Sequence, residues 1–181
     1  MKNILLYGIV VLSCCLIFTS CVKDTDFDQS EEIILSPIVE FDAIFFNLPA
    51  NRFIDSITFN PILTVSDTTK IKFLDGELLR ENLKRVEFYF KFTNTIPRNF
   101  QVDFQFLNSA NDTTFVISNP VALGRANAPV VTELFENIEG PDLDRFTQAN
   151  KLVVLVTIES ANRSLEGNLN LQSKGTYFLE H

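Results

Sequence analysis

The sequence is poor in the side chains that most catalytic and metal sites require. It has no tryptophan, a single histidine at the last position (His181), and three cysteines, Cys14, Cys15 and Cys21, all within the first 21 of 181 residues. The rest of the chain therefore has no internal disulfide and no cysteine-based zinc site. It also lacks a glycine-rich phosphate loop and the HExxH and GxSxG motifs. We expect a protein that is not an enzyme, binds no metal or cofactor, and has no small-molecule substrate.

Positive charge is also scarce. Fifteen lysines and arginines stand against 23 acidic residues, which gives a net charge of -8. Nucleic acid is therefore not an expected partner, because binding it needs clustered cations against the phosphates. Acidic pairs such as Asp142 and Asp144 are interpreted as surface carboxylates near a helix start, since nothing places two acids across a groove as a glycosidase requires.

The amino-terminal segment has the pattern of an export signal. Lys2 precedes an apolar run from Ile4 to Phe18, which is shorter than the roughly 20 residues that span a membrane. The run ends at Phe18-Thr19-Ser20-Cys21, which resembles a relaxed lipobox of the lipoproteins of Bacteroidetes-type bacteria. That resemblance implies that residues 1–20 are a signal peptide that is removed. It also implies that Cys21 carries a diacylglycerol and an N-acyl lipid, such as palmitate. An ordinary secretory signal or a signal anchor, with Cys21 incidental, is the alternative.

Residues 21–34 form an acidic stretch after that cysteine, which we interpret as a lipidated tether. The acidic stretch resembles the surface-export signal of the same lipoproteins. The resemblance implies attachment to the outer membrane through the lipid, on the cell surface, with the periplasmic face as the alternative. Residues 35–181 are then a single domain, long enough to bury a core of its own.

Two segments of that domain alternate strictly between apolar and polar residues. They are 86–93 and 100–106, and the polar, proline-containing stretch 94–99 separates them. The pattern predicts an antiparallel hairpin with one wet face. Six of its eight inward positions are phenylalanine, so this hairpin is expected at the centre of the core.

Further alternation predicts more strands. Val39, Phe41, Ala43 and Phe45 are expected to share an inward face. Strands are expected at 113–118, 130–135, 151–159 and 176–179, with 151–159 central because both its faces are apolar, and 168–172 is expected to be an outer strand. A short helix is predicted near 141–149, with Pro141 in its first turn. The predicted fold is all-β, an antiparallel immunoglobulin-like β-sandwich with this one helix. A lipocalin-like barrel is the alternative.

Elimination of other chemistries favours an interaction role. We expect a non-catalytic structural or accessory subunit of a membrane-associated complex, with outer-membrane proteins as partners. The alternative is a surface glycan-binding or adhesion module. Such sites stack sugars on tryptophan or tyrosine, and the domain offers only Tyr89, on the polar face of its strand, and Tyr177.

Three short motifs resemble the O-glycosylation signal of Bacteroidetes, in which aspartate is followed by serine or threonine and then by an aliphatic residue or threonine. They are Asp55-Ser56-Ile57, Asp67-Thr68-Thr69 and Asp112-Thr113-Thr114. The candidate acceptors are Ser56, Thr68 and Thr113. The competing interpretation is that these are polar turns, in which aspartate and threonine bond the local backbone.

Overall fold

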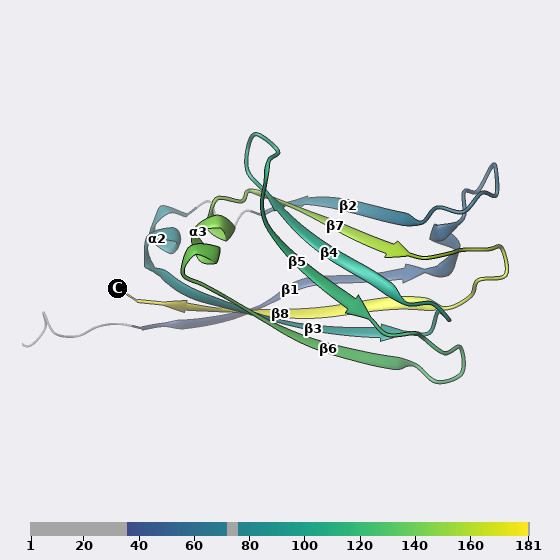
Figure 1. Cartoon of the computed structure of the whole chain (residues 1–181). Helices are drawn as coiled ribbons and strands as arrows, with labels where there is room; N and C mark the ends of the chain where they lie inside the picture. The colour runs from purple at the N-terminus through teal and green to yellow at the C-terminus, as the bar shows by residue number, and fades with distance from the viewer. Residues whose placement is uncertain (1–35, 72–75, 181) are drawn as a thin grey trace, which may run out of the picture. The chain divides into compact units, whose positions relative to one another are not determined.

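The computed structural model describes residues 36–71 and 76–180. Within these residues it contains eight strands in two four-stranded antiparallel sheets, which lie one over the other (Figure 1). The first sheet has the order β1 (Ile38–Pro49), β8 (Asn168–Leu179), β3 (Leu83–Asn94) and β6 (Val130–Glu139). The second has the order β2 (Thr64–Lys70), β7 (Lys151–Ile158), β4 (Phe100–Leu107) and β5 (Thr113–Val121). The expected all-β antiparallel sandwich is confirmed.

The pairing follows the order of a long hairpin that has been rolled up. β1 pairs with β8, β2 with β7, β3 with β6 and β4 with β5, and the sheets are completed by β8 against β3 and β7 against β4. This is jelly-roll connectivity, which places the chain within the sandwich class but differs from the immunoglobulin strand order.

The positions of two strands test the sequence interpretation. β7 lies between β2 and β4, so it is central as predicted. β8 lies between β1 and β3, so the expectation of an outer strand at 168–172 is wrong. Its alternating asparagines and glutamine mark the solvated face of an inner strand, and that pattern does not distinguish an inner strand from an edge.

The predicted hairpin of 86–93 and 100–106 is also wrong, because β3 and β4 belong to opposite sheets. Their apolar faces meet across the core, with the rings of Phe90 and Phe104 stacked at 4.9 Å. The connection crosses between the sheets around the buried Asn94. Its side-chain amide donates to the carbonyls of Arg98 and Ala122, both at 2.9 Å, and its carbonyl accepts from the Ile96 N–H at 2.9 Å.

The inward phenylalanines of these two strands are the centre of the core, as expected. Each is at most 3% exposed, and burying one such side chain contributes about 1.5–3 kcal/mol. These six are Phe88, Phe90, Phe92, Phe100, Phe104 and Phe106.

Among the described residues, three short helical segments connect the strands: η2 (Ala50–Phe53), α2 (Glu77–Asn82) and α3 (Pro141–Thr147). α3 confirms the helix predicted near 141–149, and it begins with a proline as expected. Its Phe146 is fully buried and lies 5.0 Å from the Phe106 ring and 6.3 Å from the Phe115 ring. α3 thus covers the interior where β5 and β6 meet. Within the described residues, no helix has the length and apolar character needed to cross a membrane.

Candidate functional site

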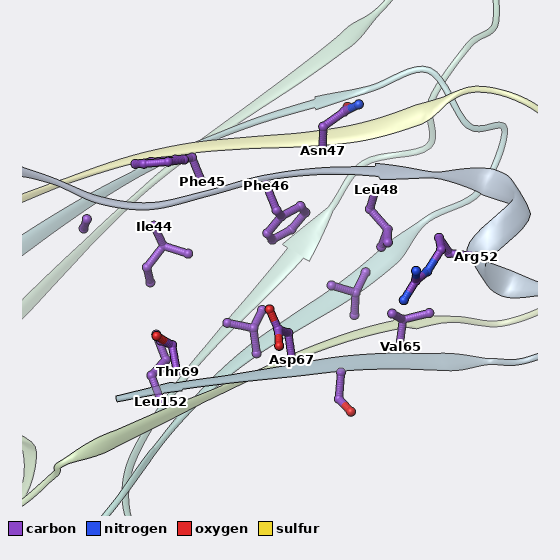
Figure 2. A pocket seen from close by; sticks show the side chains of 14 residues that line it. Ile44, Phe45, Phe46, Asn47, Leu48, Arg52, Val65, Asp67, Thr69 and Leu152 are labelled. Atoms are coloured by element: carbon purple, nitrogen blue, oxygen red, sulfur yellow. The ribbon is translucent and has the colours of Figure 1, made fainter. Parts of the chain in front are cut away.

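The opposite side of the sandwich is hollowed into a groove of about 560 Å³ between the edge strands β1 and β2 (Figure 2). We call it the β1–β2 groove. Its walls are mainly aliphatic and aromatic side chains from β1, β2 and β7. The principal ones are Ile44, Phe46, Leu48, Val65, Val154 and Val156.

A β-bulge aims the β1 side chains into the groove. The regular pairing of β1 with β8 is interrupted between Asp42 and Phe45. There the Ser173 hydroxyl donates to the Ile44 carbonyl and accepts from the Ile44 N–H, both at 2.8 Å. The bulge reverses the phase of the strand, so Phe46 faces inward and Phe45 points away from the groove, 72% exposed. The expectation that Phe45 shares the inward face is therefore wrong.

β2 contributes an unusual inward face, in which only one of three residues is apolar. Val65, Asp67 and Thr69 stand opposite the groove-lining residues Val156, Val154 and Leu152 of β7. Their side chains accordingly point into the groove (Figure 2). Asp67 accepts a hydrogen bond from the Thr68 N–H at 2.8 Å. The sequence patterns did not predict this site. The signal that could have revealed it is a short strand with polar residues, Asp67 and Thr69, in phase with Val65.

Arg52 stands at one end of the groove. It comes from the last turn of η2 and lies beside Leu48 and Val65 (Figure 2). Within the described part of the chain, its exposed guanidinium has no hydrogen bond or ion pair. Beyond it a second hollow of about 520 Å³ shares Arg52, Val65 and Ser66 with the groove. The groove thus has apolar walls on β1 and β7, polar side chains of β2 at Asp67 and Thr69, and a cation at one end.

The two edges of the first sheet differ in the charges that they present. β6 carries three acids, Glu133, Glu136 and Glu139. β1 from residue 43 to residue 48 carries none. Edge strands of natural proteins are usually protected from pairing by charges, prolines or covering elements. β6 has acids and α3 beside it, whereas the groove half of β1 is uncharged and uncovered within the described residues.

The residues predicted as sites from the sequence are dispersed. Cys21 lies outside the described residues. Ser56, Thr68 and Thr113 are all exposed, in a turn, on β2 and at the start of β5. β2 and β5 are opposite edges of the second sheet, so the structure does not bring these three acceptors together. Their modification stays a prediction.

In the turn at Ser56, the neighbouring aspartate forms hydrogen bonds with the local backbone, as the interpretation of these motifs as polar turns predicts. The Asp55 carboxylate accepts from the N–H groups of Thr58 at 2.6 Å and Ile57 at 2.9 Å. These hydrogen bonds lower the pKa of Asp55, because they favour its charged form. Here aspartate serves to shape the backbone turn.

The two tyrosines of the domain have different surroundings. Tyr177 is buried against Phe41, at a ring distance of 4.5 Å, and this burial raises its pKa. Tyr89 lies on the outer face of the first sheet, where its hydroxyl donates to Glu133 at 2.7 Å. That hydrogen bond raises the pKa of Tyr89, because it favours the protonated phenol. The Tyr89 ring is 5.0 Å from that of Phe135, which is 77% exposed.

The described residues hold no cluster of three or more histidine, cysteine, aspartate or glutamate side chains that could bind a metal. Asp142 and Asp144 occupy the first turn of α3, and Asp142 forms an ion pair with Arg145 one turn later. The two aspartates are thus surface carboxylates in the first turn of a helix, where the helix dipole favours negative charge.

Comparison with known proteins finds only distant structural likenesses. No family model matches the chain, and no curated protein matches it. A "putative secreted protein" from Parabacteroides distasonis is 13% identical with a TM-score of 0.45, over 63% of this chain and 37% of that one. The VP2 subviral particle of infectious bursal disease virus is 8% identical with a TM-score of 0.43, over 80% of this chain and 32% of that one. The chain thus spans about a third of the length of these structures, and at such identities the likeness concerns the fold alone.

Proposed function

We propose that this protein is a non-catalytic, lipid-anchored lipoprotein of the outer membrane and an accessory subunit of a membrane-associated complex. In this proposal it binds a protein partner through the β1–β2 groove. The observation that carries the proposal is the groove itself, a mainly apolar hollow left open between two edge strands. Such a hollow buries apolar surface when a partner fills it, which is the main favourable contribution to association.

In this proposal, the lipid at Cys21 holds the protein at the outer membrane. Each buried methylene of an acyl chain contributes about 0.8 kcal/mol, so two or three chains hold a protein stably at the membrane. Attachment raises the effective concentration of the sandwich beside integral membrane partners. A modest affinity of the groove for its partner is then enough to keep the two proteins associated.

The groove is tested by two tryptophan substitutions at neighbouring positions of β7. Val154 faces the groove, whereas Val153 points to the other face of the sheet. Val154→Trp fills the groove, so it is expected to lose the integral membrane proteins that co-purify stoichiometrically in mild detergent from the native host. Val153→Trp, the matched control, retains them, and equal melting temperatures establish that both variants fold. Retention of the same partners by both variants would contradict a groove-dependent role.

The anchor is tested separately. Cys21→Ser is expected to abolish labelling with a radioactive fatty acid and to release the protein from washed membranes. A protein that remains membrane-bound without its cysteine would rule out the lipobox interpretation.

A second candidate function, glycan binding, rests on the pair formed by Tyr89 and Phe135. Their rings offer an exposed aromatic surface next to a hollow of about 410 Å³ that Glu87, Lys174 and Thr176 also line. Aromatic faces with nearby hydrogen-bonding groups are suited to a sugar ring. On a glycan array, Phe135→Ala and Tyr89→Ala should both weaken any signal, whereas Phe45→Ala should not. An array without a signal for the wild-type protein removes this candidate.

A further inference from the structure

We propose that the occupant of the β1–β2 groove is an extended polypeptide strand of the partner, which adds to the free edge of β1 and places an acidic side chain at Arg52. This inference rests on the proposed function, because it specifies what the groove binds. The proposed occupant is a partner protein, and not a lipid, a second copy or the acidic tether (residues 21–34) of the same chain.

The backbone of β1 is the first argument. β1 is an edge strand, so at residues 45–48 the side away from β8 presents N–H and C=O groups that pair with no other strand of the described residues. Residues 43–48 carry no charge, and Phe45 projects 72% exposed from the same stretch. An uncharged, apolar edge is a template for another strand. The edge of β2 is less suited, since it carries Asp67 and Lys70.

The shape of the groove is the second argument. Residues 44–48 of β1 and 65–69 of β2 flank it, and at about 3.3 Å per residue this is room for about five residues of extended chain. A strand bonded to β1 directs alternate side chains inward, where they lie beside Phe46 and Leu48 and over Val65. It would complete the apolar layer on this side, as α3 does at the other.

The charges are the third argument. Arg52 has no partner among the described residues, and an acidic side chain of the bound strand would pair with it. Asp67 excludes the most obvious competitor, a fatty acyl chain. Such a chain would strip water from this carboxylate without offering a hydrogen bond, which is costly. A polypeptide brings N–H and hydroxyl donors to the same place.

The experiment uses the chain from residue 21 with Cys21→Ser, which keeps the acidic tether but needs no detergent. Two capped heptapeptides share the core Val-Thr-Val-Thr-Val and differ at their ends, which are both aspartate in one and both lysine in the other. Amide hydrogen exchange is followed over β1 and over β6, with myristate as a third probe. The aspartate peptide is expected to slow exchange at residues 45–48 and not in β6, and to bind several-fold more tightly than the lysine peptide. Arg52→Glu, a surface change, is expected to reverse that preference.

Four results would overturn the inference. Exchange at 45–48 that neither peptide slows would show that the edge does not accept a strand, and equal affinities would remove the role of Arg52. Protection by myristate alone would identify an acyl-chain site. Slow exchange at residues 45–48 without any peptide would mean that the protein itself fills the groove. The occupant would be the acidic tether if the slow exchange is independent of protein concentration, and a second copy if it increases with concentration. Should Val154→Trp still lose the native partner when no peptide binds, the proposed function stands and the partner docks through a folded surface instead.

Discussion

Removal of the Phe146 ring tests whether α3 closes its side of the sandwich. The ring is fully buried and packs against Phe88 at 5.9 Å, Phe106 at 5.0 Å and Phe115 at 6.3 Å. Truncating a buried phenylalanine to alanine costs about 3–5 kcal/mol, from lost transfer free energy and the cavity left behind. For a folded unit of this size, each kcal/mol lowers Tm by about 2–4 °C. Phe146→Ala should therefore lower Tm by about 10 °C.

The assay is thermal and urea unfolding of the chain from residue 21 with Cys21→Ser. Phe45→Ala is the control. Phe45 is 72% exposed, and surface substitutions usually stay within about 0.5 kcal/mol. Equal, small losses in the two variants would refute the reasoning, because the helix would then rest on the sandwich without completing its core.

Two further substitutions test the core connection and the pH dependence. Asn94→Ala removes the side-chain partner of the buried Ile96 N–H and of the partly buried carbonyls of Arg98 and Ala122, which should cost about 1–3 kcal/mol by urea unfolding. The exposed Asn137→Ala should change little, and a similar small loss in both would contradict the role given to Asn94. Burial, and secondarily Asp142, raise the pKa of Glu136 above its ordinary 4.5. The folded state therefore binds more protons than the unfolded state. The free energy of unfolding accordingly falls as the pH rises from that value through the higher pKa of the folded state. Glu136→Gln should accordingly raise Tm at pH 7 and give no gain below about pH 4, and a gain that is the same at both pH values would rule out titration as its cause.

The alternation of the sequence predicted which residues of β3 and β4 are buried, because a buried face repeats every two residues whatever sheet the strand joins. For the same reason it could not predict which sheet each strand joins. The stretch 94–99 has turn residues, but Asn94 binds carbonyls at Arg98 and Ala122 and leads the chain across the core. Only the long-range pairing decides between a hairpin and a crossover.

The candidate site was out of reach of sequence patterns for a related reason. The groove joins residues 43–48, 65–69 and 152–156, which are far apart in the chain and share no motif. The bulge that exposes Phe45 depends on the hydroxyl of Ser173, more than a hundred residues away in sequence. In retrospect, the polar residues in phase with Val65 on β2 were the one local signal, since a fully covered strand would not place Asp67 inward.

The most direct test of the central claim is site-specific photo-crosslinking in the native host. A photo-reactive phenylalanine analogue replaces Phe45 at the β1 edge beside the groove or, as the matched control, Val116 on the far edge strand β5, which is 42% exposed. We expect one discrete protein adduct from position 45 and none from position 116. An adduct from position 116 alone, or the same adduct from both positions, would contradict the groove as the surface that binds the partner.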